Sequence, residues 1–278
     1  MVDITAALVK ELRDATNVSM MECKRALVES EGDIEKATRV LRERGMAVAA
    51  KKASRATNQG LIASATADDG KSASLVQVNC ETDFVARNDG FKAFVAELAG
   101  KALETDSALG EELKDEIVAK VAEIGENIVI PGNTRFVQES TGLIQSYIHL
   151  GGKVGVLIEI GCEKAETLEA PAFKELAKDL SLHVAACNPQ YLTSDEVPDE
   201  EISSEKEIFA KQVEGKPAEI IDRIVDGKIK KYFGEICLVD QGFVKEPKQS
   251  LTELLAETGK KVDDEICIRR FVRYQLGQ

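Results

Sequence analysis

The sequence has no tryptophan, only 5% aromatic residues and only two histidines, His149 and His183. Proteins that hold single-stranded nucleic acid stack bases on aromatic side chains, so this shortage argues against such a role. The net charge of −13 argues the same way, because phosphate binding requires clustered positive charge. A local basic patch is compatible with these totals, but we expect no direct nucleic-acid ligand.

Long apolar runs are also absent. No stretch approaches the roughly 18 consecutive apolar residues of a membrane helix. Residues 1–16 contain acidic side chains and no long apolar core, unlike a signal peptide. The six cysteines are far apart and form no CxxC pair, which favours reduced thiols over disulfides and gives no metal-ligand spacing. We therefore expect a cytoplasmic protein without a membrane segment.

Motifs for catalysis and nucleotide binding are missing as well. The chain contains no GxxxxGK[ST], GxGxxG, HExxH or GxSxG motif. Cys187 follows His183 by four residues, so both can share one helix face. We interpret this pair as small core residues, because catalytic dyads are usually assembled from separate elements. The residues alone therefore predict an interaction protein with no catalytic residues, no cofactor and no metal.

Residues 4–45 predict three short helices in a compact bundle. Each helix has one apolar stripe: Ile4, Leu8 and Leu12 in the first, Cys23, Ala26 and Leu27 in the second, and Ile34, Ala37 and Leu41 in the third. Ser19 and Glu22 have capping-box spacing, and Gly45 is expected to end the third helix. Met20 and Met21 lie at the turn before the second helix. Either one of them packs in the core, or both belong to an adaptable contact surface.

Residues 47–55 are small and basic, and they predict a helical tail or linker after the bundle. An internal repeat then begins at Gly60. Shifting the chain by 82 positions without a gap aligns 12 identical residues among the 39 from Gly60 to Leu98. One offset over this length indicates two copies of a supersecondary unit. Each copy predicts an antiparallel hairpin with a helix across it. The expected strands are 60–67 and 73–80, then 142–149 and 154–162; the expected helices are 90–100 and 172–186.

The two copies differ just after their second strand. The first copy runs from an apolar strand, 75–80, through Glu81 into Thr82-Asp83-Phe84-Val85, whereas the second has Lys-Ala-Glu-Thr at 164–167. Polar residues before Phe84 can cap a helix. The second copy has no apolar pair there, so the unit does not require one. This comparison favours a surface-contact role for Phe84, beside the alternative that its ring packs in the core.

The remaining segments are predicted from periodicity and turn residues. Residues 104–128 have a helical pattern, and Pro131-Gly132-Asn133 predicts a turn between strand-like flanks. Two charged helical stretches in 200–232, divided at Glu214–Pro217, predict a projecting helical hairpin. The rest is expected as strands at 234–239 and 266–272, a helix at 247–258, and a frayed tail of six residues.

Together these elements predict an α+β protein in four parts. A three-helix bundle and linker occupy residues 1–54. The first core subdomain occupies 55–139, and the second occupies 140–187 together with 234–278. The helical hairpin at 188–233 is an insertion into the second core subdomain.

Several stretches closely resemble the family of bacterial translation elongation factor Ts. They occur in the family's order and spacing over nearly the whole chain: Val9–Arg13, Met20–Leu27, Gly32–Ala37, Val78–Ala86 and Ile124–Ile128. The chain departs from some members in having Glu81 where they have glutamine, and Leu150 after His149.

This resemblance implies a function that needs no acid, base or nucleophile. Members are guanine-nucleotide exchange factors that bind the GDP form of the GTPase elongation factor Tu, displace Mg²⁺ and promote GDP release so that GTP can bind. The resemblance also implies the parts of the fold. The N-terminal bundle is similar to a ubiquitin-associated domain, the repeated units to two core subdomains, and the charged hairpin to a coiled-coil protrusion.

The same resemblance implies which residues contact elongation factor Tu. Thr82, Asp83, Phe84 and Val85 would lie against its GTPase domain, with Phe84 wedged between helices beside the magnesium site and phosphate loop. The other implied contacts are Lys10, Arg13, Met20 and Met21 in the N-terminal domain and His149 in the second core subdomain.

Two alternatives belong to other classes of function. One is an adaptor whose three-helix domain binds a ubiquitin-like or ribosomal partner, which would give binding without nucleotide release. The other is a thiol enzyme that uses Cys187 with His183, whose activity would be lost on alkylation.

Overall fold

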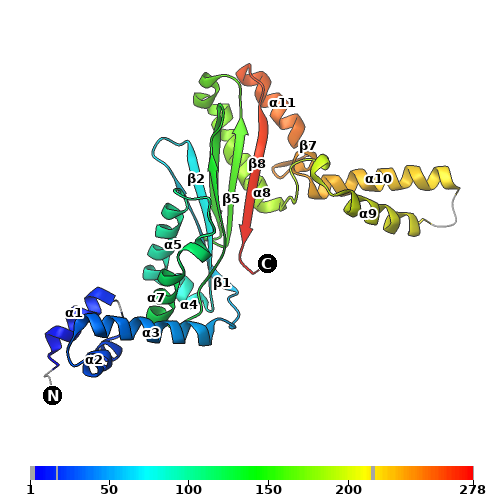
Figure 1. Cartoon of the computed structure of the whole chain (residues 1–278). Coiled ribbons are helices and arrows are strands. Elements are labelled where there is room, and N and C mark those ends of the chain that lie inside the picture. Colours follow the sequence, from blue (N-terminus) through cyan, green and yellow to red (C-terminus); the bar gives the residue numbers. More distant parts are fainter. Residues whose placement is uncertain (1–3, 17, 214–216, 278) are drawn as a thin grey trace. The chain divides into compact units, whose positions relative to one another are not determined.

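The structure, a computed structural model, describes residues 4–16, 18–213 and 217–277. It divides into two compact bodies, one made of residues 1–63, 76–134 and 275–278 and the other of residues 64–75 and 135–274. The chain is mixed α+β, with three N-terminal helices followed by sheets and further helices (Figure 1). The predicted α+β class is confirmed at this level.

The N-terminal helices are α1 (Ala6–Thr16), α2 (Met20–Glu29) and α3 (Ile34–Lys52). Their apolar stripes meet in a small core. The predicted core residues that are buried in it are Leu12, Cys23, Ala26, Leu27, Ala37 and Leu41. The Ser19 hydroxyl accepts a hydrogen bond from Glu22 N, which confirms the predicted cap of α2, and Asp33 caps α3 in the same way.

The first sheet has the strand order β1-β2-β3. Its strands and the neighbouring helices are β1 (Gln59–Thr66), β2 (Ser72–Cys80), α4 (Asp83–Arg87), α5 (Asp89–Lys101), α6 (Leu109–Glu112), α7 (Lys114–Ile124) and β3 (Val129–Val137). The central strand β2 is buried along most of its length. Helix α3 packs along α7, where Gly45 approaches Ala122.

The second sheet has the order β4-β5-β8. Its elements are β4 (Gly142–His149), β5 (Val154–Gly161), η1 (Ala165–Glu169), α8 (Pro171–Cys187), α11 (Leu251–Val262) and β8 (Cys267–Gln275). Helix α8 covers β4 and β5, and Phe173 and Leu180 of α8 join the core beneath it. Glu159 on β5 is buried and forms ion pairs with Arg269 and Arg270 of β8, which compensate its charge.

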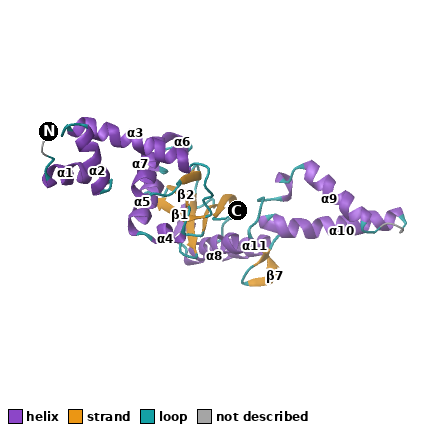
Figure 2. Ribbon diagram, turned by 90° about the horizontal axis from the view of Figure 1, so that it is seen from below, coloured by secondary structure: helices purple, strands orange, loops and turns teal. Residues whose placement is uncertain are grey.

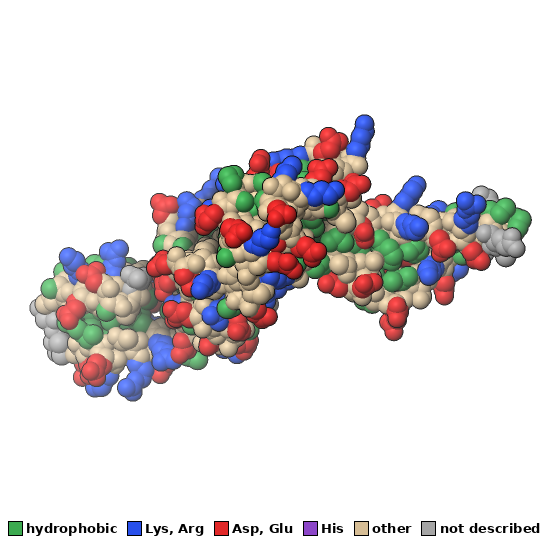
Figure 3. All heavy atoms as spheres, turned by 90° about the horizontal axis from the view of Figure 1, so that it is seen from above, with side chains coloured by type: hydrophobic (Ala, Val, Ile, Leu, Met, Phe, Trp, Pro, Cys, Tyr) green, Lys and Arg blue, Asp and Glu red, His purple; other side chains and the backbone are tan. Residues whose placement is uncertain are grey.

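A helical hairpin follows α8. It is formed by α9 (Asp199–Lys211) and α10 (Ala218–Ile236), which lie side by side in Figures 1 and 2. Short elements flank it: η2 (Ser194–Glu196), η3 (Leu238–Asp240), β6 (Gly242–Phe243) and β7 (Glu246–Ser250). Figure 3 shows apolar side chains along this arm, and Ile208 and Ile220 are exposed. The predicted helical stretches are confirmed; residues 214–216 of the predicted turn lie outside the described residues.

Two predicted helix ends are wrong. Helix α3 continues through Gly45 to Lys52, because Ala47, Ala49 and Ala50 favour the helix and Gly45 lets α7 approach closely. Helix α10 continues to Ile236, so residues 234–239 are not a strand. The apolar spacing from Tyr232 to Ile236 suits a helix, and Ile236 is buried in the small core at the base of the hairpin.

Predictions for the strands also need correction. Pro131 and Asn133 lie within β3 rather than in a turn, because β3 is an edge strand, where proline's missing N–H is tolerated. The Asn133 amide instead accepts a hydrogen bond from Leu109 N. Strand β8 extends to Gln275, so most of the expected tail is ordered. Helix α11 begins at Leu251, later than predicted, because Ser250 and Glu253 form a capping box there.

Both copies of the predicted hairpin-and-helix unit are present. The first unit is built on β1, β2 and α5, and the second unit is built on β4, β5 and α8. Strands β2 and β5 begin at Ser72 and Val154, and helices α5 and α8 begin at Asp89 and Pro171. Between strand and helix, α4 in the first unit corresponds to η1 in the second. The point where the two copies differ in sequence is therefore a short helical turn in both.

Candidate functional site

The site is the turn that connects β2 to α5. Thr82 has extended backbone geometry and its hydroxyl accepts a hydrogen bond from Val85 N, which makes it the N-cap of α4. Ala86 is buried and anchors the turn, and Val85 is half-buried. Phe84 is 82% exposed. The prediction that Phe84 faces the surface is confirmed, and the core alternative is wrong.

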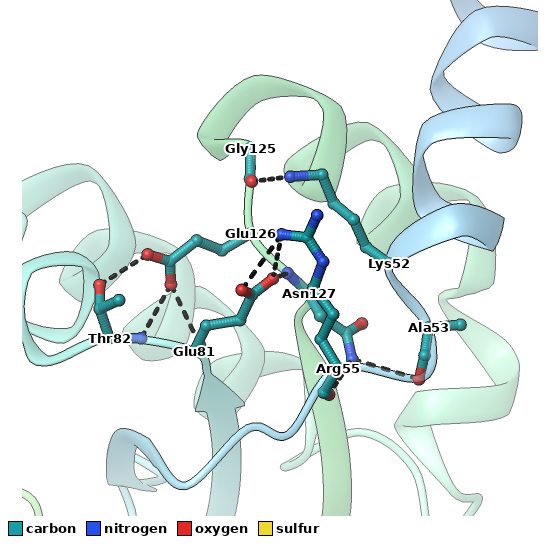
Figure 4. Close-up of polar contacts among 8 residues, drawn as sticks. All are labelled: Lys52, Ala53, Arg55, Glu81, Thr82, Gly125, Glu126 and Asn127. Carbon is teal, nitrogen blue, oxygen red and sulfur yellow. Dashed lines mark hydrogen bonds and ion pairs between the residues drawn. The ribbon is translucent and has the colours of Figure 1, made fainter.

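Glu126 fastens this turn from the end of α7 (Figure 4). Its Oε2 atom accepts hydrogen bonds from Glu81 N and Thr82 N, both at 3.0 Å, and its Oε1 atom accepts one from the Thr82 hydroxyl at 2.6 Å. Gly125, at φ 81°, ends α7 in the left-handed conformation that turns the chain toward β3. Three donors thus converge on one carboxylate, an arrangement of strong, charge-assisted hydrogen bonds.

Glu81 completes a second layer of contacts beside the turn. Its Oε1 atom accepts a hydrogen bond from Asn127 N at 2.7 Å, and this bond, more than the ion pair with Arg55, lowers the pKa of Glu81. The Asn127 amide donates to the carbonyls of Ala53 and Arg55, just after α3. Lys52 also donates to the Gly125 carbonyl (Figure 4). The exchange of contacts between Glu81 and the 126–127 segment is therefore reciprocal.

The other members of the predicted tetrapeptide have local roles. Asp83 pairs with Arg87 one turn later at 3.0 Å, and both side chains are largely solvated, so the pair adds little to stability. Cys80, at the end of β2, donates to the Thr82 carbonyl. Burial, together with the Glu126 charge, raises the pKa of the Cys80 thiol to about 11, which keeps it protonated and unreactive.

The second unit holds its own turn with the same device. Asp264 follows Asp263, the left-handed cap of α11, and accepts hydrogen bonds from Glu163 N, Lys164 N and the Thr167 hydroxyl. Glu166 occupies the position that corresponds to Phe84 and is exposed. The two turns thus share a carboxylate that accepts two successive backbone N–H groups and a hydroxyl, and they differ in what they present.

The predicted N-terminal contact residues are all on the surface. Lys10 and Arg13 are exposed on α1, and Met20 and Met21 are 41% and 60% exposed at the start of α2. The alternative that one methionine packs in the core is wrong. These positions are available for binding, and their role in it stays a prediction.

His149 lies at the end of β4 and is exposed. Its Nδ1 atom is 2.8 Å from the Tyr147 hydroxyl, and the two rings stack with their centroids 5.7 Å apart. The next residue, Leu150, is exposed at a φ of 49° in the turn to β5. Tyr147 therefore orients the imidazole, and the predicted contact of His149 stays a prediction.

The Cys187–His183 pair is not arranged for catalysis. His183 is fully buried; its Nδ1 atom accepts a hydrogen bond from Val244 N at 3.1 Å, and its Nε2 atom lies 2.9 Å from Gln241 Oε1. The Cys187 sulfur is 3.7 Å from Nδ1, and burial raises the pKa of its thiol. Both ring nitrogens thus have structural partners, which supports the interpretation of His183 as a core residue, whereas Cys187 is only half-buried.

Within the described residues, no helix is long and apolar enough to cross a membrane. The same part of the chain contains no group of three or more metal-ligating His, Cys, Asp or Glu side chains.

Comparison with known proteins agrees with the motifs at this site. A family model described as elongation factor TS matches residues 81–278. The elongation factor Ts of Desulfovibrio desulfuricans is 43% identical over 100% of this chain and 99% of its own length. Those of Clostridium botulinum and Clostridium perfringens are 42% and 44% identical over 99% of this chain and 93% of their own lengths. The chain belongs to the elongation factor Ts family. Members of this family are exchange factors rather than enzymes, and the chain is a nucleotide exchange factor for elongation factor Tu in translation elongation.

Sequence reasoning missed Glu126 as part of the site. The only signal was its place in the motif Ile124–Ile128, which by itself gives no role. Glu126 lies 44 residues after Thr82 in the chain. Their hydrogen bond is found only in the structure, where the turn after α7 lies beside the turn after β2.

Proposed function

We propose that this chain binds the GDP form of elongation factor Tu directly and promotes nucleotide release by inserting Phe84 beside the magnesium site of the GTPase. The observation that carries this proposal is an exposed Phe84 on a turn held by three partly buried hydrogen bonds to Glu126. A single exposed apolar side chain is common. A bulky ring on a rigidly fastened turn is instead typical of an interface anchor, because little conformational freedom is lost on binding.

The chemistry of the partner explains why a wedge suffices. A P-loop GTPase holds its nucleotide through backbone N–H groups, a lysine and Mg²⁺. Displacing Mg²⁺ leaves phosphate charge poorly neutralised, which weakens nucleotide binding. A protein that prefers the nucleotide-free GTPase must weaken nucleotide affinity by the same factor, because the coupling between two ligands is reciprocal. No bond is broken, so this step requires no catalytic group.

We propose further contacts in the same complex. We assign Lys10, Arg13, Met20 and Met21 of the N-terminal helices to the GTPase domain, and His149 to the partner surface of the second core subdomain. The four-part division is retained as a proposal: a ubiquitin-associated-like domain at 1–54, a first core subdomain at 55–139, a second at 140–187 with 234–278, and a coiled-coil insertion at 188–233. Their exposed positions and the paired turns support these assignments.

The test is the release of labelled GDP from purified elongation factor Tu. Phe84→Ala should lower the stimulated release rate by at least about tenfold, since truncating an aromatic anchor typically costs about 2 kcal/mol or more. Glu166→Ala, at the corresponding position of the second turn, is the matched control and should leave the rate unchanged. The melting temperature of Phe84→Ala should stay near that of the wild type, because the ring is 82% exposed.

Unchanged release by a folded Phe84→Ala variant would exclude the wedge. Binding of elongation factor Tu without any stimulated release by the wild-type chain would instead favour the adaptor alternative.

A further inference from the structure

Glu126 carries the hydrogen bonds that define the direction of the exposed turn. Its two oxygens accept from the backbone N–H groups of Glu81 and Thr82 and from the Thr82 hydroxyl. These are the last two residues before α4, whose first residues are Asp83 and Phe84. A change in the Thr82 backbone would rotate the start of α4 and with it the Phe84 ring.

The Thr82 hydroxyl links the carboxylate to the helix. It donates its proton to Glu126 Oε1 and accepts the N–H of Val85 through its oxygen. Because Glu126 takes the proton, the lone pairs of the hydroxyl face the first turn of α4, as an N-cap requires. The carboxylate therefore determines both the backbone and the rotamer of the capping residue.

A comparison with the second unit distinguishes the orientation of Phe84 from a general contribution to folding. Asp264 accepts the corresponding backbone N–H bonds from Glu163 and Lys164, and a hydroxyl bond from Thr167, yet the turn it holds presents Glu166 rather than an apolar ring. Each carboxylate fastens a turn in its own unit, and only Glu126 fastens one that carries Phe84. The chain thus contains its own control for the loss of such a carboxylate.

We infer that Glu126 is a positioning residue for nucleotide exchange, which acts through Thr82 to hold Phe84 in the orientation that enters the GTPase. This inference rests on the proposed function of Phe84. A carboxylate is required because all three of its partners are donors. Glutamine has nearly the same shape, but its NH₂ group would face the Thr82 hydroxyl or a backbone N–H, so one donor would lose its acceptor.

The kinetic test compares Glu126→Gln with Asp264→Asn in the GDP-release assay. Glu126→Gln should lower the stimulated release rate by about tenfold, the effect of losing one hydrogen bond to a charged group. Asp264→Asn removes the equivalent charge from the other turn and should leave the rate within about twofold of the wild type. An unchanged rate for Glu126→Gln, or an equal loss for Asp264→Asn, overturns the inference.

A direct test of orientation needs no partner. The chain has no tryptophan, so Phe84→Trp introduces a single tryptophan at the tip of the turn, whose fluorescence can be excited without that of the tyrosines. Nanosecond anisotropy decay of this variant reports local motion of the ring. Adding Glu126→Gln should increase the amplitude of the fast decay, whereas adding Asp264→Asn should not. Equal fast amplitudes with and without Glu126→Gln overturn the positioning role.

A second pair of variants covers the case in which Glu126→Gln does not fold. Thr82→Ser keeps the hydroxyl that joins Glu126 to α4, and Thr82→Val removes it with little change in volume. Release should be retained by Thr82→Ser and fall by about tenfold in Thr82→Val; equal rates for both overturn the inference. Failure of the proposed function is distinct, because it would appear as unchanged release by Phe84→Ala.

Discussion

His183 is a buried titratable side chain of the second unit, and the exchange function does not use it. Its Nδ1 atom accepts the Val244 N–H, and its Nε2 atom is within hydrogen-bonding distance of Gln241 Oε1. This geometry suits the neutral ring with its proton on Nε2, since a proton on Nδ1 would face the N–H of Val244. Burial lowers the pKa of His183, and the contact with Gln241 opposes this only in part.

The lowered pKa predicts a pH-dependent stability. Above the unfolded value of about 6.5 both states are neutral at this site, so the full stability is present. As pH falls below that value the unfolded chain takes up a proton that the folded chain resists. The free energy of unfolding should therefore fall by up to about 1.4 kcal/mol per pH unit until the folded pKa is reached.

The measurement is urea unfolding at several pH values between about 5 and 7, where the carboxylates with lowered pKa are ionised in both states. His183→Gln keeps one donor and one acceptor but binds no proton in this range, so its stability should be flat across the same interval. A wild-type stability that is independent of pH there would contradict the buried, neutral ring.

Single residues of the site differ in how well the sequence foretells them. Phe84 could be singled out because the second repeat has Glu166 in its place, which showed that the fold does not need the ring. Glu126 could not be singled out, because glutamate is frequent in the sequence and because the three donors that bind it lie 44 and 45 residues away in the chain. Periodicity detects side chains that face a core, but it contains no information on such pairings.

Among whole elements, two of the errors of sequence reasoning lie at a glycine and a proline. Gly45 was expected to end α3, yet it lies in the helix interior where α7 approaches. Pro131 was expected in a turn, yet it lies in an edge strand. Both residues lower the intrinsic preference for the element, and in both cases tertiary packing decides. The predicted hairpins and the helices α5 and α8 were located well, since they have long apolar patterns with glycine between the strands.

Two helical glycines with different surroundings give a prediction at this scale. Gly227 in α10 has no neighbour within 4 Å of an added Cβ, whereas a Cβ on Gly45 would lie 3.3 Å from the Ala122 Cβ. Gly227→Ala should raise the free energy of unfolding by about 0.5–1 kcal/mol through helix propensity alone. Gly45→Ala should give no such gain, because the same propensity is offset by crowding against α7.

Urea unfolding of both variants beside the wild type measures the difference. An equal gain for the two alanines would mean that α3 and α7 separate easily at Gly45. A loss for Gly227→Ala would show that this face of α10 is not free.

At the scale of the whole chain, the two sheets repeat one plan. In each, a hairpin leads through a short helical turn to a long helix, and a later helix ends in a left-handed residue followed by an acid and the third strand. In the first unit the left-handed residue is Gly125, the acid is Glu126 and the third strand is β3. In the second unit they are Asp263, Asp264 and β8. In the second unit the helical hairpin of α9 and α10 lies between α8 and α11.

The comparison of the two sequence repeats revealed only the first half of this shared arrangement, from the hairpin to the long helix. The ungapped match ends near Leu98, after which the connections to the third strands differ in length and composition. The later correspondence depends on backbone shape and on the chemical class of one residue, glutamate in one unit and aspartate in the other. A residue-by-residue alignment does not register such a match, although the hydrogen bonds are equivalent.

The repeated plan predicts that the contact turn can be exchanged without loss of the fold. The variant replaces four residues of the first turn with those of the second: Thr82→Lys, Asp83→Ala, Phe84→Glu and Val85→Thr. The backbone N–H groups of residues 81 and 82 remain available to Glu126, as those of Glu163 and Lys164 are to Asp264. Residue 85 becomes threonine and can donate to Glu126 as Thr167 does to Asp264.

The melting temperature of this variant should therefore change by only about 2–4 °C, the shift that roughly 1 kcal/mol gives in a chain of this size. Stimulated GDP release should fall at least as far as in Phe84→Ala, because the apolar anchor is replaced by a charge. Circular dichroism and the release assay on the same preparation decide the outcome. Loss of folding would show that residues 82–85 are needed by the first unit itself, and retained release would place the exchange activity elsewhere on the chain.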